Sequence, residues 1–111
     1  MLGKGKGKQD MEKLEQYSLF IGLNDATSKK QEISTEDAIK TVSNVIRGGS
    51  ISQIHGVYTH EDGTKVNEST LRVDVLYTDD ATVRLYCQDL KKLLNQESIL
   101  VQKQEISGMF V

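Results

Sequence analysis

The chain is short of several residue types, and each shortage excludes a class of protein. Its 111 residues include no proline, no tryptophan and one cysteine. A single cysteine forms no disulfide within the chain, and it excludes zinc sites built from two or four cysteines. No apolar run approaches the roughly 20 residues of a membrane span, and the N-terminus lacks the apolar segment of a signal peptide. We therefore expect a cytoplasmic protein without a membrane partner.

The charge is also close to balanced. Lysine and arginine number 14 and aspartate and glutamate 16, so the formal net charge is −2. Proteins that bind nucleic acid in general carry a clear basic excess, so nucleic acid is not an expected partner. Hydrophobic residues make up 37% of the chain. That share and the length fit one domain with one modest core.

The first 15 residues differ from the rest in composition. Lys4, Lys6 and Lys8 alternate with glycines. Glycine loses much backbone entropy on ordering and like charges repel, which favours a flexible tail. We expect a tail over residues 1–15, or a helical turn over 10–16, and a single domain over 16–111. The three lysines are where an acidic partner or nucleic acid would be held.

Apolar periodicity divides the domain into six elements. Alternation at every second residue predicts strands over residues 17–23, 51–60, 65–77 and 98–104, the last extending toward 111. Spacings of three and four predict helices from Ser34 to Gly48 and from about residue 79 to Asn95. Ser34, and one of Thr78, Asp79 and Asp80, are the candidate N-caps. Asp62-Gly63 predicts a hairpin turn because that turn requires a positive φ.

The element order is β-α-β-β-α-β, which restricts the topology. Two right-handed crossover units joined by a hairpin give a four-stranded antiparallel sheet with both helices on one face. The sequence therefore predicts an α+β fold, the ferredoxin-like sandwich.

The opposite face of this sheet has no helix to cover it. The residues expected there mix apolar and charged side chains: Phe20, Leu76, Arg72, Asp74 and either Val57 or Tyr58. We expect a homodimer through this open face, or a protein or small-molecule partner bound to it.

The positions of the two histidines and the cysteine do not predict a metal site or a catalytic nucleophile. His55 and His60 lie five residues apart on one strand and so point to opposite faces. They are expected to be structural or exposed, although one of them is a candidate for binding a ligand. Cys87 lies in the middle of a helix within an apolar stripe, where a thiol is buried and inert. No metal and no cofactor is predicted.

Two carboxylates stand where strands begin. Glu68 precedes a half-buried strand and Glu97 precedes an apolar run. Two carboxylates in unlike surroundings can act as acid and base. In the structural alternative, Glu68 pairs with Arg72 or Lys65, and residues 96–98 finish a helix and begin a strand.

Four segments resemble a small bacterial domain family of unknown function with a ferredoxin-like fold. That family has a strand near Leu-Tyr-Phe-Gly-Leu, a Gly-x-Trp hairpin followed by Glu-x-Ser, and a Gln-Glu-Ser-Val-Leu segment. The similar segments here are Tyr17 to Leu23, Gly56-Val57-Tyr58, Glu68-Ser69 and Gln96-Glu97-Ser98-Ile99-Leu100. Tyr58 stands in place of the tryptophan, and the family's proline-rich segment is missing. The resemblance implies a shared polar site at Tyr58, Glu68, Gln96 and Glu97.

Two functions follow from these observations. The main expectation is a small non-enzymatic protein that binds a protein or a small ligand, as an inhibitor or sponge encoded by a phage or mobile element would. The alternative is a small cofactorless enzyme with a pocket between sheets, in which Glu68 and Glu97 act as acid and base and Tyr58 and His55 position the substrate. The candidate ligand-binding residues are Tyr58, Glu68, Gln96, Glu97, His55 and Arg72.

Overall fold

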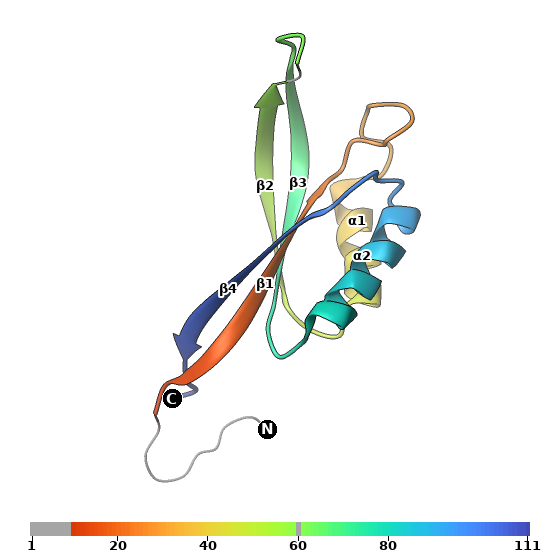
Figure 1. The fold of residues 1–111 in the computed structure, drawn as a ribbon. Coiled ribbons are helices and arrows are strands. Elements are labelled where there is room, and N and C mark those ends of the chain that lie inside the picture. Colours follow the sequence, from red (N-terminus) through yellow and green to blue (C-terminus); the bar gives the residue numbers. More distant parts are fainter. Residues whose placement is uncertain (1–9, 60) are drawn as a thin grey trace.

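The computed structural model describes residues 10–59 and 61–111, and it confirms the predicted fold. The elements are β1 (Glu12–Gly22), α1 (Thr35–Val45), β2 (Ser50–Thr59), β3 (Lys65–Val75), α2 (Asp80–Leu93) and β4 (Leu100–Gly108). The strands lie in the order β2-β3-β1-β4 and each pairs antiparallel with its neighbour. Both helices pack on the same side of the sheet (Figure 1). This is the ferredoxin-like α+β sandwich.

The core lies between the helices and the two central strands. Alternate residues of β1 and β3 point toward the helices, and the antiparallel register sets Leu19 beside Val73 and Ile21 beside Leu71. The α1 and α2 helices cover this face of the sheet and contribute apolar residues spaced three and four apart. The largest fully buried side chains are Leu19, Ile21, Leu23, Val42, Leu71, Val73 and Leu90.

Shortening a core side chain by one methyl group tests this packing. Ile21 is fully buried in β1, whereas Ile54 in β2 is 39% exposed. We expect Ile21→Val to lower the free energy of unfolding by about 0.5–1.5 kcal/mol, since it removes buried apolar surface and leaves a small cavity. Ile54→Val is the matched control and should change it far less. Equal losses in urea unfolding would contradict the assignment of the core.

The helix ends follow the predicted caps. The Ser34 hydroxyl accepts a hydrogen bond from the Asp37 N–H at 3.0 Å. Of the three candidates for α2, Asp79 is the N-cap, and its carboxylate accepts from the Thr82 N–H at 2.8 Å. That bond lowers the pKa of Asp79. Neither helix, of 11 and 14 residues, nor any other in the described ranges is long and apolar enough to cross a membrane.

Strand β1 begins earlier than the sequence predicts. Residues 12–16 extend β1 and pair with residues 104–108 of β4, so the tail boundary at residue 15 and the helical turn over 10–16 are both wrong. These residues are weakly apolar, and their conformation is set by pairing with β4, a contact remote in sequence. The lysines of residues 1–9 lie outside the described residues, as does His60.

The apolar periodicity over residues 79–95 predicts a buried stripe on α2 that includes Cys87 and Leu93, and the structure departs from it at both. Leu93 is 60% exposed, because the stripe follows spacings of three and four through Val83, Tyr86, Leu90 and Leu94 and passes beside it. Cys87 is half-buried. Burial raises the pKa of its thiol, so Cys87 remains a protonated thiol at neutral pH, as predicted for an inert cysteine.

The register settles which residues occupy the open face. Tyr58 pairs with Val66, and Phe20 pairs with Arg72. Residues 58, 66, 72 and 20 therefore share the face that points away from the helices, while Val57 lies on the helix side. Arg72 lies over the Phe20 ring at 5.4 Å and its Nε donates to Asp74 at 3.1 Å. The predicted positions of Phe20, Arg72 and Asp74 on the open face are confirmed.

Candidate functional site

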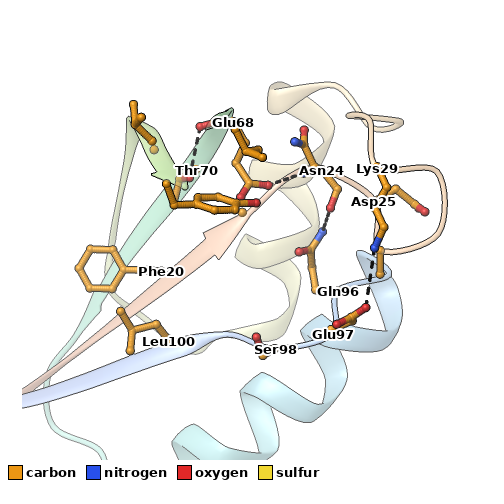
Figure 2. Close-up of a pocket in the computed structure, with 16 residues that line it drawn as sticks. Phe20, Asn24, Asp25, Lys29, Glu68, Thr70, Gln96, Glu97, Ser98 and Leu100 are labelled. Atoms are coloured by element: carbon orange, nitrogen blue, oxygen red, sulfur yellow. Dashed lines mark hydrogen bonds and ion pairs between the residues drawn. The ribbon is translucent and has the colours of Figure 1, made fainter. Parts of the chain in front are cut away.

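A pocket of about 680 Å³ opens where the sheet's open face meets two loops. One loop, residues 23–34, joins β1 to α1, and the other, residues 94–99, joins α2 to β4. The strands supply a floor and the loops supply one rim (Figure 2). The lining includes Phe20, Gly22, Asn24, Lys29, Gly56, Tyr58, Glu68, Thr70, Gln96, Glu97 and Leu100.

The pocket brings together four of the six residues that sequence analysis selected. Tyr58, Glu68, Gln96 and Glu97 all line it. His55 and Arg72 lie outside the lining. His55 Nε2 is hydrogen-bonded to Asn67 Oδ1 at 2.9 Å across the β2–β3 hairpin, and Arg72 is engaged with Asp74 on the open face.

The Glu68 carboxylate is the polar centre of the pocket. It extends from β3 across the neighbouring strand β1, where Gly22 leaves room for it. A Cβ atom built at Gly22 would lie 2.5 Å from the Glu68 carboxylate carbon. Glu68 Oε2 accepts a hydrogen bond from the Asn24 N–H at 2.9 Å (Figure 2). Glu68 thus belongs to the pocket, and the alternative of pairing with Arg72 or Lys65 is not what the structure shows.

Tyr58 stands next to this carboxylate from strand β2. Gly56 pairs directly with Glu68, and Tyr58 lies one position further along the same face. Burial raises the pKa of Tyr58, and so does its hydrogen bond with the Glu68 carboxylate. The phenol therefore stays protonated at neutral pH and acts as a hydrogen-bond donor at the carboxylate.

Glu97 does not form the second half of an acid–base pair. Its side chain is 77% exposed and lies 3.9 Å from the equally exposed Lys29 ammonium at the rim. Figure 2 shows Glu68 and Glu97 on different sides of the pocket. Two carboxylates take separate acid and base roles only when their surroundings differ enough to separate their pKa values, and a solvent-exposed rim position does not provide such surroundings. The paired-carboxylate expectation is therefore wrong for Glu97, which belongs to a solvated rim.

Gln96 serves the architecture of the rim. Its Nε2 donates to the Asn24 carbonyl oxygen at 2.8 Å and to the Leu94 carbonyl oxygen at 3.2 Å. The apolar wall opposite comes from Phe20 and Leu100, which pair across β1 and β4. Gly22 and Leu100 also line the pocket, although the sequence did not predict them there. A glycine inside an otherwise apolar strand is the signal for a close approach.

A second polar cluster lies on the helix side of the sheet, beside a pocket of about 500 Å³. The Tyr17 hydroxyl donates to Asp80 Oδ1, and Lys103 Nζ lies 3.1 Å from the same oxygen. The Tyr17 hydrogen bond lowers the pKa of Asp80, and Lys103 lowers it further. These three side chains satisfy one another and join β1, α2 and β4, which indicates a structural role.

The lowered Asp80 pKa predicts a pH dependence of stability. A carboxyl whose pKa falls on folding stabilises the protein above its unfolded value, here 3.8, and loses that contribution as the pH falls through the folded value. We expect Asp80→Asn to lower the urea midpoint slightly at pH 7 and to match the wild-type chain at acid pH. Asp89→Asn, on the same helix, is the control. An Asp80→Asn deficit that is independent of pH would contradict this assignment.

Within residues 10–59 and 61–111, no group of three or more His, Cys, Asp or Glu side chains is placed to hold a metal ion. The pocket's titratable lining consists of Asp25, Lys29, Tyr58, Glu68 and Glu97. Its chemistry is that of one partly buried carboxylate with a phenol beside it, an apolar wall, and a charged rim.

Comparison with known proteins identifies structural neighbours only. No family model and no curated protein sequence matches the chain. The fold is similar to a phage SAM lyase in complex with S-methyl-5'-thioadenosine, with a TM-score of 0.65, 18% identity, and coverage of 99% of this chain and 96% of that one. It is also similar to a phage SAM lyase in the apo state, with a TM-score of 0.62, 19% identity, and coverage of 99% and 97%.

These neighbours correct the main functional expectation. A non-enzymatic binding protein was expected, yet both similar structures are enzymes, each sharing this fold over nearly its whole length. The alternative, a small enzyme, therefore becomes the proposal. The resemblance to a bacterial domain family stays a prediction.

Proposed function

We propose that the protein is a lyase that cleaves S-adenosylmethionine (SAM) and releases S-methyl-5'-thioadenosine. The observation that carries the proposal is the Glu68–Tyr58 pocket on the open face of a fold shared with phage SAM lyases. The fold alone hosts many functions, so the chemistry of the pocket has to support this substrate.

The lining offers a complement to each part of SAM. The substrate carries a sulfonium and an α-ammonium group, and the Glu68 carboxylate in its half-buried position attracts a cation. Phe20 and Leu100 provide an apolar wall on which a purine ring packs. Lys29 brings a positive charge to the rim, where the substrate carboxylate would be held.

The bond changes define what the protein must supply. Release of S-methyl-5'-thioadenosine breaks the bond between sulfur and Cγ, and sulfur keeps the electron pair and becomes a neutral thioether. In one route, Cγ forms a bond to the substrate's own carboxylate oxygen, which closes a lactone. In the other route, a base takes a proton from Cβ, and the electrons of that C–H bond form a double bond between Cβ and Cγ. A Cβ hydrogen is a very weak acid and a carboxylate a weak base, so proton removal by Glu68 is poorly matched. We therefore favour ring closure, in which the protein orients the substrate and Glu68 holds its cationic end.

A product assay tests the proposal. Purified protein incubated with SAM should yield S-methyl-5'-thioadenosine by mass spectrometry, and proton NMR should show lactone ring signals rather than vinyl signals. S-adenosylhomocysteine is the control, since it lacks the sulfonium that makes sulfur a good leaving group, and it should remain intact. If SAM disappears no faster with the protein than it does by spontaneous decay, the proposal is overturned.

We also propose that the protein forms a homodimer through the open face of the sheet. Ile54, Tyr58 and Leu100 are 39%, 44% and 58% exposed on that face, and Arg72 and Asp74 neutralise each other there. We expect a homodimer in light scattering, and Leu100→Glu should shift it to monomer by placing a charge in the contact. A chain that is monomeric at every concentration would contradict this prediction.

A cytoplasmic location and a phage or mobile-element source likewise remain predictions.

A further inference from the structure

Two residues just after α2 hold the opposite loop of the pocket in place. Asn95 Nδ2 donates to Asp25 Oδ1 at 2.8 Å and to Thr27 Oγ1 at 3.1 Å. The Asn95 carbonyl accepts from the Ala26 N–H at 2.9 Å. Gln96 Nε2 adds the bond to the Asn24 carbonyl oxygen at 2.8 Å (Figure 2). These bonds join the loop over residues 24–30 to the segment that follows α2.

The held loop is the one that fixes Glu68. Asp25 Oδ1 also accepts from the Thr27 and Ser28 N–H groups at 2.8 and 3.0 Å, which closes the loop into a tight turn. At the start of that turn, Asn24 donates its N–H to Glu68 Oε2 at 2.9 Å. Asn24 is thus held through its carbonyl by Gln96 and through its N–H by Glu68. A continuous chain of hydrogen bonds runs from the end of α2 to the carboxylate.

We propose that Asn95 and Gln96 are positioning residues for Glu68, acting through Asn24; the catalytic part of this inference rests on the proposed SAM lyase function. Glu68 is a long, flexible side chain that lies over Gly22, a residue with no side chain to confine it. A site must hold such a group within about 0.5 Å of its productive position. The Asn24 N–H restricts Glu68 only while the loop itself is held.

The backbone conformation of Asn95 allows a substitution that removes its side-chain hydrogen bonds and keeps the turn. Asn95 has a φ of 48°, a conformation that favours asparagine or glycine after a helix. Glycine satisfies that backbone equally well but lacks the amide that holds Asp25 and Thr27. Asn95→Gly therefore removes the two side-chain bonds and keeps the turn.

The test combines a measurement without substrate and one with SAM. In Asn95→Gly and Gln96→Ala, amide hydrogen exchange at Asn24, followed by NMR, should become about tenfold faster, the scale of one lost hydrogen bond. In the same variants kcat/KM for SAM should fall about tenfold. The control is Gln88→Ala, on the solvent side of α2, which should change neither quantity. Thermal unfolding of each variant establishes that the fold is kept.

The outcomes separate this inference from the proposed function. Unchanged Asn24 exchange in both variants overturns the positioning role, whatever the activity. Faster exchange with wild-type kcat/KM also overturns it, because a merely structural contact behaves in that way. If the wild-type chain leaves SAM intact while exchange at Asn24 accelerates, the hydrogen-bond chain is supported and the lyase proposal fails.

Discussion

Glu68→Gln is expected to lower kcat/KM for SAM by about 10- to 150-fold, the range that corresponds to the loss of one hydrogen-bonded charged group. Glutamine keeps the size of the side chain and the acceptor for the Asn24 N–H, but it removes the negative charge that holds the substrate cation. The fold should be unaffected, because the side chain lies over open sheet rather than in the core.

The distribution of this loss between KM and kcat identifies the role of the carboxylate. If Glu68 holds the cationic end of the substrate, KM rises most and kcat changes less. If Glu68 removes a proton from Cβ, kcat collapses. Glu97→Gln is the matched control, since Glu97 lines the same pocket from its exposed rim, and its effect should stay within about threefold, as for other exposed ion pairs. Equal losses in both variants would contradict the assignment of Glu68 as the polar centre.

The fold could be predicted because its signals are local. Alternation along β1 and β3, caps at Ser34 and Asp79, and the Asp-Gly turn each act within a few residues. The start of β1 could not be predicted in the same way. Residues 12–16 are extended because they pair with residues 104–108, and no local pattern marks that contact.

The site was predictable only in part, for a related reason. Glu68 and Gln96 stood out as polar residues at the ends of elements, and the topology does bring them to one pocket. The sequence does not distinguish the half-buried Glu68 from the exposed Glu97, since burial depends on Gly22 and on the loop that carries Asn24. These partners lie 44 or more residues from Glu68.

The missing catalytic motif is consistent with the proposed reaction. Ring closure uses the substrate's own carboxylate as nucleophile and its own sulfonium as leaving group. The protein then needs no nucleophile and no proton relay, and positioning is its main contribution. Such an enzyme shows a shaped pocket and one charged anchor in place of a constellation such as Ser-His-Asp. For this reason, a lack of motifs was weak support for a binding protein.

Gly22→Ala is expected to reduce kcat/KM as far as Glu68→Gln does, although it removes no charged group. The added Cβ would lie 2.5 Å from the Glu68 carboxylate carbon and 2.5 and 2.6 Å from its oxygens. The backbone at Gly22 is not left-handed, so alanine fits the strand and the free energy of unfolding should hold or rise slightly. The flexible carboxylate has to move away, and it then leaves the Asn24 N–H.

The double variant and a second glycine make this prediction specific. If Gly22→Ala acts through Glu68, adding it to Glu68→Gln should reduce activity little further, because both changes remove the same interaction. Gly48→Ala is the control, since a Cβ there meets no atom within 4 Å, and it should leave kcat/KM unchanged. Additive losses in the double variant would mean that Gly22 matters through the substrate or the strand rather than through the carboxylate above it.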